Sequence, residues 1–209
     1  MVKIKLCGVQ TEEDVHLMNK YRPDYIGFIL APSKRRVSIQ KVRKLAPLVA
    51  KDIQKVGVFV RAPKNEILSF VREGLIDCIQ LHGDETKYYI QELKKSLSGI
   101  GKDDIPLIQA IRVKEKEDIE RANESIADYV LLDKYHKASY GGEGESFDWS
   151  LLKGIKRPYF LAGGVGEENV KKAFSLGPYA VDLSSKIEKN GKKDEALVRA
   201  FMQACLKAV

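Results

Sequence analysis

Two residues that end apolar stretches of the chain, Cys7 and Asp133, could exchange protons with a substrate. Cys7 closes the run Lys3–Cys7, in which polar and apolar side chains alternate, and Asp133 follows the run Tyr129–Leu132. Thiol and carboxyl groups both serve as general acids and bases in enzymes. Each also has a structural interpretation, because free cysteines commonly pack in cores and an aspartate after a strand can simply open a loop.

A second set of residues suits a phosphate group. Gly163 and Gly164 follow an apolar run near 159–162, and Asp182, Ser184 and Ser185 end or follow a run near 180–183. Backbone amides and hydroxyls in such loops can surround a phosphate. A Gly-Gly pair by itself is more often an ordinary loop, so the prediction depends on the two loops being neighbours.

Three further side chains could contact an anionic substrate. Arg35 and Arg36 follow the apolar run that ends at Leu30, and a guanidinium group offers a planar pair of donors to a carboxylate. His82 directly follows Leu81 and is equally consistent with a ligand contact or with a hydrogen-bonded histidine at a rim. The alternative for the arginines is an exposed loop charge.

The elements that must position these residues form a repeating pattern. Apolar runs alternate with amphipathic stretches along the whole chain, which predicts repeated βα units around a parallel sheet. The eight predicted strands are Val2–Cys7, Tyr25–Leu30, Lys55–Val60, Cys78–Leu81, Pro106–Ile111, Tyr129–Leu132, Tyr159–Ala162 and Ala180–Leu183. The predicted helices begin near Thr11, Ser38, Lys64, Glu85, Lys114, Asp148, Glu167 and Lys193.

We predict an α/β fold, a (β/α)8 TIM barrel that forms a single domain over residues 1–209. An open doubly wound sheet is the alternative, but its usual Gly-rich turn is absent after the first strand, which continues Gly8-Val9-Gln10. In a barrel, functional residues gather at the carboxyl ends of the strands. Since strand side chains alternate in direction, Lys3, Lys5 and Cys7 should face the interior, and Asp133 should face Cys7 across the mouth.

Composition limits the remaining possibilities. The 209 residues carry a formal net charge of +7, but the basic residues are spread over most predicted helices, so we expect no nucleic acid partner. We expect a soluble, cytoplasmic protein with no membrane partner, because no stretch resembles a signal peptide or a membrane span. The three cysteines suggest free thiols and no metal site. The pattern leaves a monomer and a homodimer equally open.

Ordered motifs along the chain resemble those of the phosphoribosylanthranilate isomerase family. The resemblance covers the whole length, and its motifs are Lys5-Leu6-Cys7-Gly8, Asp24-Tyr25-Ile26-Gly27-Phe28, Arg36-Val37-Ser38, Val56-Gly57-Val58-Phe59-Val60, Gln80-Leu81-His82-Gly83-Asp84-Glu85, Leu132-Asp133, Gly141-Gly142-Glu143-Gly144, Phe147-Asp148-Trp149, Leu161-Ala162-Gly163-Gly164, Glu168-Asn169-Val170 and Val181-Asp182-Leu183-Ser184-Ser185.

The resemblance implies an isomerase of tryptophan biosynthesis that carries out an Amadori rearrangement, an internal aldose-to-ketose conversion that needs no cofactor. It implies that Cys7 is the general base and Asp133 the general acid. It also implies that Arg36 contacts the anthranilate carboxylate and that the last two strand loops bind the phosphate. At neutral pH an ordinary cysteine is mostly a thiol and an ordinary aspartate mostly ionised, so the site must alter both, with Lys5 favouring the Cys7 thiolate.

Three positions depart from the family pattern, namely Gln10, Lys186 and Asn190. Lys186 stands where glycine is usual, so it could alter the phosphate loop or contact the phosphate itself. The Gly-rich stretch 134–147 is predicted to act as a lid. The competing interpretations are another phosphate-binding barrel, such as indole-glycerol-phosphate synthase or a sugar-phosphate epimerase, and a barrel that binds phosphorylated ligands without catalysis.

Overall fold

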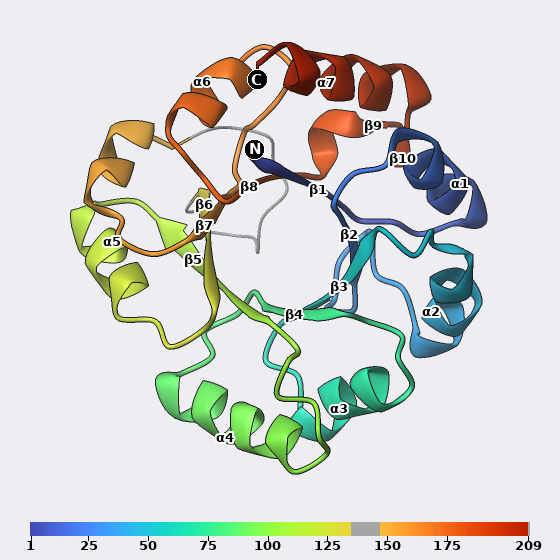
Figure 1. Cartoon of the computed structure of the whole chain (residues 1–209), viewed down its shortest axis with the longest axis vertical. Coiled ribbons are helices and arrows are strands. Elements are labelled where there is room, and N and C mark those ends of the chain that lie inside the picture. Colours follow the sequence, from blue (N-terminus) through green and yellow to red (C-terminus); the bar gives the residue numbers. More distant parts are fainter. Residues whose placement is uncertain (135–146, 209) are drawn as a thin grey trace.

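Eight parallel strands close into a barrel in the computed structural model, which describes residues 1–134 and 147–208. The strands follow one another in chain order, and β1 pairs with both β2 and β8 (Figure 1). They are β1 Lys3–Cys7, β2 Tyr25–Ile29, β3 Gln54–Phe59, β4 Cys78–Leu81, β5 Leu107–Val113, β6 Tyr129–Lys134, β7 Tyr159–Leu161 and β8 Ala180–Leu183. The predicted (β/α)8 barrel is confirmed.

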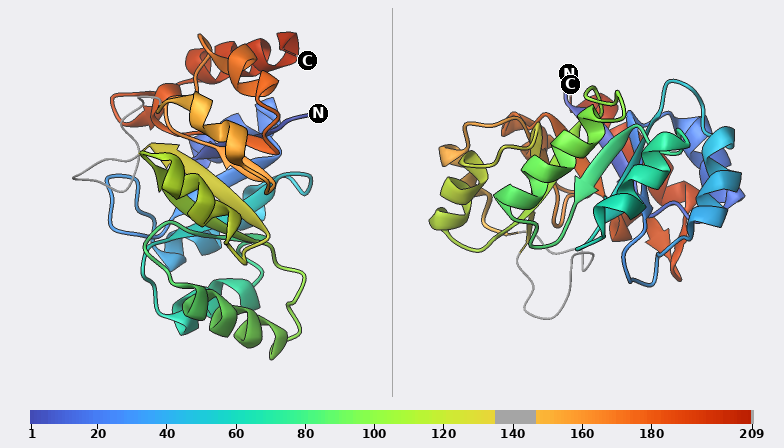
Figure 2. Two further views of the ribbon diagram at one scale, coloured as in Figure 1. Left: turned by 90° about the vertical axis from the view of Figure 1, so that its left-hand side faces the viewer. Right: turned by 90° about the horizontal axis from the view of Figure 1, so that it is seen from below.

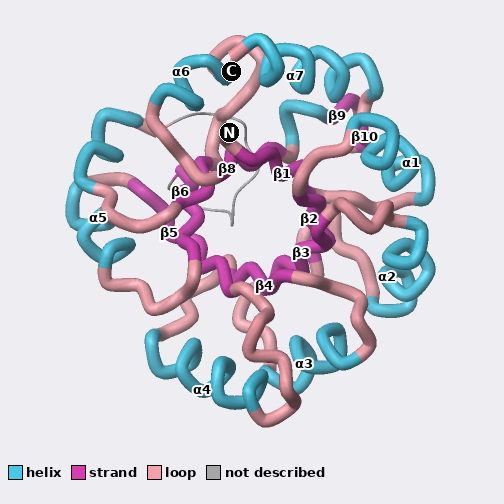
Figure 3. The backbone as a smooth tube through the Cα atoms, in the orientation of Figure 1, coloured by secondary structure: helices cyan, strands magenta, loops and turns pink. Residues whose placement is uncertain are grey.

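Helices surround the ring of strands on its outside (Figure 3). They are α1 Glu12–Tyr21, α2 Ile39–Leu45, α3 Lys64–Arg72, α4 Lys87–Ser98, α5 Lys116–Asn123, α6 Val170–Ser175 and α7 Glu195–Lys207. Short 3₁₀ helices are η1 Ala46–Leu48, η2 Trp149–Gly154 and η3 Ser185–Ile187. Thr11 and Ser38 cap α1 and α2 at the predicted positions, because each side chain accepts a hydrogen bond from the first turn.

Several predicted helix starts differ from the structure, and α6, for example, begins at Val170, three residues after the predicted Glu167. The segment after Asp148 forms the 3₁₀ helix η2, not an α-helix, and its two buried residues, Trp149 and Leu152, are three positions apart, a spacing that places both on one side of a 3₁₀ turn. The helix predicted from Lys193 begins at Glu195. Lys193 belongs instead to a hairpin of β9 Glu188–Lys189 and β10 Lys192–Lys193, beside α1 in Figure 1.

The strands separate two apolar layers. The larger lies between the barrel and the helices, and Leu6 and Leu132 belong to it. The smaller fills the barrel interior and includes Cys7, Leu131 and Phe160. The alternation along β1 and β6 is therefore as predicted, with every second side chain pointing inward.

Both chain ends lie at one end of the barrel, the end where the strands begin (Figure 2). The carboxyl ends of the strands form the opposite end, here called the mouth. Among the residues that the structure describes, no helix is long and apolar enough to cross a membrane.

Candidate active site

The inward face of β1 places Lys5 directly below Cys7. Lys5 is fully buried, and its ammonium donates a hydrogen bond to Asp182 on β8 at 2.8 Å. The two residues are also register partners on adjacent strands. A buried lysine is strongly disfavoured unless a carboxylate compensates its charge, so this pair accounts for a polar residue in the interior of β1.

Asp133 is buried at the end of β6, where it meets His82. Its Oδ2 lies 3.5 Å from His82 Nε2, and its Oδ1 accepts a hydrogen bond from the backbone N–H of Lys134 at 2.8 Å. Gln80 Nε2 lies 2.6 Å from His82 Nδ1. With the Gln80 amide donating to Nδ1, the ring proton of a neutral His82 sits on Nε2 and faces the carboxyl group.

Asp182 connects the two proposed proton-transfer residues electrostatically. It interacts with Lys5, Asp133 and His82, while Lys5 interacts with both Asp182 and Cys7. Cys7 and Asp133 thus lie at the same end of the interior, and the buried pair of Lys5 on β1 and Asp182 on β8 interacts with both. Sequence reasoning predicted this common placement but not the connecting pair.

Burial is the largest influence on the acidity of the Cys7 thiol. Burial raises the pKa of the Cys7 thiol, and the positive charges of Lys5 and Lys193, which lower it, do not fully compensate. Lys5 lowers the pKa of Cys7, as the sequence predicted. The net pKa nevertheless lies above the ordinary value for cysteine, and in that respect the prediction is wrong, because removal of the thiolate from water outweighs the nearby charges.

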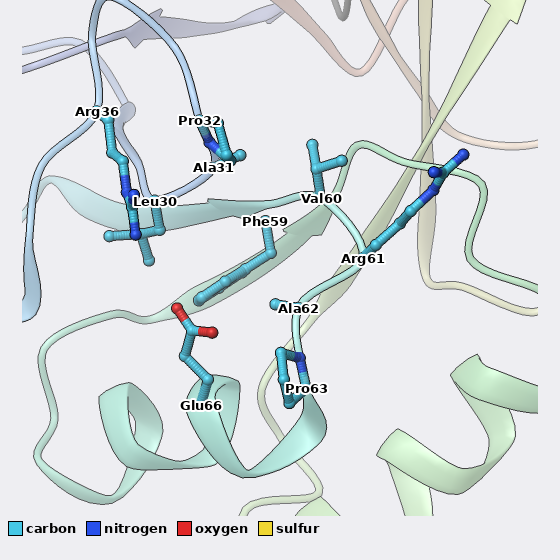
Figure 4. Close-up of a pocket in the computed structure, with 10 residues that line it drawn as sticks. All are labelled: Leu30, Ala31, Pro32, Arg36, Phe59, Val60, Arg61, Ala62, Pro63 and Glu66. Atoms are coloured by element: carbon cyan, nitrogen blue, oxygen red, sulfur yellow. The ribbon is translucent and has the colours of Figure 1, made fainter.

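The two arginines after β2 have different environments. Arg35 makes a bidentate pair with Glu188, with Nε at 2.8 Å and Nη2 at 2.7 Å from its oxygens. Arg36 instead lines a pocket between the loops after β2 and β3 (Figure 4). Most of the other lining residues are apolar: Leu30, Ala31, Pro32, Phe59, Val60, Ala62 and Pro63.

The loops after β7 and β8 approach the ends of their neighbouring strands. Gly163 packs so closely that a side-chain carbon there would lie 2.9 Å from Asp133 Oδ1, and its φ of +70° also favours glycine. Gly164 is held by Asn169, whose amide donates to its carbonyl at 2.9 Å. In the loop after β8, the buried hydroxyl of Ser184 makes no hydrogen bond with the described residues. Ser185 begins η3.

The positions that depart from the family pattern have defined contacts. Lys186 pairs with Glu168 at 2.8 Å, which joins the loops after β8 and β7. Gln10 donates to the carbonyl of Lys34 at 3.3 Å. Asn190 and Gly191 both have positive φ, 54° and 75°, and form the two-residue turn between β9 and β10. An Asn-Gly pair is a strong hairpin signal that sequence reasoning overlooked.

Two residues near Cys7 were missed from the sequence, Glu188 and Lys193. Both lie in a run of charged residues typical of a solvated loop, yet both side chains are buried.

The predicted lid, 134–147, falls almost entirely outside the described residues. Within 1–134 and 147–208, no group of histidine, cysteine and acidic side chains is arranged to hold a metal ion.

Comparison with known proteins identifies close relatives. The family model for N-(5'phosphoribosyl)anthranilate (PRA) isomerase matches residues 4–204. The N-(5'-phosphoribosyl)anthranilate isomerase of Thermoanaerobacter sp. (strain X514) is 39% identical over 206 residues, 97% of each chain. The phosphoribosyl anthranilate isomerase structure from Thermus thermophilus superposes with a TM-score of 0.86 at 28% identity, over 100% of both chains.

A second solved structure contains a ligand. It is a phosphoribosyl anthranilate isomerase in complex with reduced 1-(o-carboxyphenylamino)-1-deoxyribulose 5-phosphate. It matches with a TM-score of 0.81 and 30% identity, over 99% of this chain and all of the other.

Proposed function

This chain belongs to the N-(5'-phosphoribosyl)anthranilate isomerase family, and from that membership we propose that Cys7 and Asp133 carry out its reaction. The substrate is N-(5'-phosphoribosyl)anthranilate and the product is 1-(2-carboxyphenylamino)-1-deoxyribulose 5-phosphate, in tryptophan biosynthesis. One observation carries the assignment of roles. Cys7 and Asp133 both face the interior at the mouth, from β1 and β6, and Lys5 and Asp182 connect them electrostatically.

The chemistry divides between an acid and a base. Asp133, in its protonated form, gives a proton to the ring oxygen of the sugar, and the ring opens to a Schiff base. Cys7, as the thiolate, removes the proton from sugar C2 and leaves an enolamine. Tautomerisation of the enolamine to the ketone completes the rearrangement, with no net change in oxidation state of the substrate as a whole.

Contacts at two flanking sites would hold the substrate. The pocket beside Arg36 is lined by apolar residues together with Arg61 and Glu66, and its apolar part suits a planar aromatic ring whose carboxylate pairs with the Arg36 guanidinium group. The loops after β7 and β8, with Gly163, Gly164, Ser184 and Ser185, suit the phosphate, and the unpartnered Ser184 hydroxyl is a donor for it. His82, which the sequence leaves open as a ligand contact or a hydrogen-bonded rim histidine, lies with its ring against Asp133 and is proposed to orient that acid beside the substrate.

The test is turnover of N-(5'-phosphoribosyl)anthranilate, followed by the loss of anthranilate-type fluorescence. Cys7→Ala is expected to lower kcat by at least about 100-fold, the usual size of an acid–base contribution. Cys78→Ala is the matched control, since Cys78 is also a buried interior thiol but begins β4 at the other end of the barrel. Near-normal turnover by Cys7→Ala would refute the role of the base. A wild type that binds the reduced product analogue without turnover would indicate a binding protein.

A further inference from the structure

The side chain of Lys193 enters the barrel mouth from the β9–β10 hairpin and contacts two strand ends. Only 1% of this side chain is exposed. Its ammonium donates hydrogen bonds to the Cys7 carbonyl at 2.6 Å and to the Ser184 carbonyl at 3.2 Å. One cation therefore joins the end of β1, which carries the proposed base, to the loop after β8, which carries the proposed phosphate contact.

Glu188, on the opposite strand of the hairpin, holds this cation in place. It accepts a hydrogen bond from Lys193 at 2.7 Å and the bidentate pair from Arg35. The cluster of Arg35, Glu188 and Lys193 thus contains two cations and one carboxylate. Buried ion pairs are poor devices for stability alone, since apolar residues often replace them without loss. A role for the charge itself is the better explanation.

The charges around Cys7 support this explanation. Lys5 reaches Cys7 from β1, but Asp182 on β8 pairs with Lys5 at 2.8 Å and compensates its charge. From β2 the neighbour is Gly27, which carries no charge. Arg35 and Lys193 also act on Cys7, and Glu188, which pairs with both, carries a single negative charge. Burial lowers the pKa of Lys193, and the pair with Glu188 counteracts that effect and favours the charged ammonium. The cluster of Arg35, Glu188 and Lys193 therefore supplies the uncompensated positive charge beside the Cys7 thiol.

We propose that Lys193 is a positioning residue for the isomerisation, which holds the Cys7 backbone and favours the thiolate form of Cys7, while Glu188 limits that effect. The inference rests on the proposed role of Cys7 as the base. Burial raises the pKa of the Cys7 thiol, whereas Lys5 and Lys193 lower it, so the balance depends on a few nearby charges.

Alkylation of Cys7 by iodoacetamide tests the proposal without substrate. The rate is measured from pH 6 to 11 in a background of Cys78→Ala and Cys205→Ala, because only the thiolate reacts. Lys193→Met is expected to move the midpoint upward by at least about half a pH unit, since a positive charge is lost. Glu188→Gln is expected to move it downward, because a negative charge is lost. Lys192→Met, which removes the exposed neighbouring lysine, should leave the midpoint unchanged.

The opposite signs separate an electrostatic role from a merely structural one. Structural damage would impair both variants in the same sense, so shifts of one sign, or no shift for Lys193→Met, would overturn the proposal. If Lys193→Met does not fold, Lys193→Arg serves instead: it retains the charge and should keep the midpoint while altering KM through the displaced Ser184 loop.

The kinetic measurement completes the experiment. The ascending limb of kcat/KM against pH reports the base of the free enzyme, so it should shift with the alkylation midpoint in each variant. For Lys193→Met this corresponds to a loss of about threefold or more in kcat/KM at neutral pH. If Cys7→Ala is inactive but Lys193→Met follows the wild type in both assays, only this inference fails. If Cys7→Ala remains active, the proposed function fails.

Discussion

The two ends of the barrel interior each contain an inward-facing cysteine, but their surroundings differ. Cys7, at the mouth, lies beside Lys5, Lys193 and, through Lys5, Asp182. Cys78 begins β4 at the opposite end, among the aromatic rings of the interior layer, which are Tyr25, Tyr129, Phe160 and Tyr179. There burial raises the pKa of the Cys78 thiol to about 12.

The two ends of the barrel interior therefore differ in their expected roles, with chemistry at the mouth and packing at the aromatic end. The aromatic end is held by ring contacts, for example Phe160 edge-on to Tyr25 with centroids 5.5 Å apart, and by the Tyr25–Tyr179 hydroxyl pair at 2.9 Å. The mouth contains buried charges whose interactions compensate one another only in part. Changes at the mouth should therefore affect chemistry first, and changes at the aromatic end should affect stability alone.

The largest effect on the free energy of unfolding is expected for the buried ion pair of Lys5 and Asp182. Lys5→Met leaves Asp182 buried without its partner, and loss of one member of a buried pair costs about 3–5 kcal/mol of unfolding free energy. Urea denaturation measures the loss. Lys3→Met is the control on the same strand: its pair with Asp24 is exposed, so at most about 1 kcal/mol should be lost.

The pH dependence of Lys5→Met gives a second test of the same pair. Burial raises the pKa of Asp182, and Lys5 counteracts that rise. Without Lys5 the pKa in the folded state rises further above the unfolded value, so the folded protein retains a proton that the unfolded chain loses. The destabilisation should therefore grow as the pH rises from about 5 to 8. A loss that is constant with pH, or equal to that of Lys3→Met, would contradict this account.

Asp133→Asn is expected to separate chemistry from stability at the mouth. The amide oxygen can still accept the hydrogen bond from Lys134 N–H, so the unfolding free energy should change by less than about 1 kcal/mol. The amide cannot supply the acidic proton, so kcat should fall by at least about 100-fold, equivalent to about 2.7 kcal/mol. Steady-state kinetics and denaturation of one preparation check both. If the unfolding free energy and kcat both fell strongly, the prediction that Asp133 serves chemistry and not stability would be wrong.

The smallest effect is expected at the aromatic end. Tyr179→Phe removes the hydroxyl pair with Tyr25 and should lower the unfolding free energy by about 1 kcal/mol without changing kcat. Tyr88→Phe is the matched control, because the Tyr88 side chain is 71% exposed and its change should stay within about 0.5 kcal/mol. If Tyr179→Phe altered kcat, the two ends would be coupled, and the division of roles would be wrong.

Regular patterns along the chain were sufficient to predict the barrel and the direction of its strand residues. The alternation of polar and apolar residues in Lys3–Cys7 correctly placed Lys5 and Cys7 inside the barrel, because successive side chains of any β-strand point to opposite faces. The apolar run before Asp133 likewise placed that carboxyl group at the mouth. These features depend on neighbours in sequence, so they can be read without the fold.

The tertiary structure alone decided which charged residues act on the site. Arg35 and Arg36 are adjacent and identical in type, yet one pairs with Glu188, 153 positions away, and the other lines the pocket. Lys193 lies in a charged run that resembles a solvated loop, and only the return of the hairpin against β1 buries it on the Cys7 carbonyl. The sequence by itself determined the barrel and the inward faces of its strands, and it predicted Cys7 and Asp133 as the proton-transfer pair. The tertiary fold decided which residues pair with the buried charges, because electrostatic interactions depend on distance in space and not along the chain.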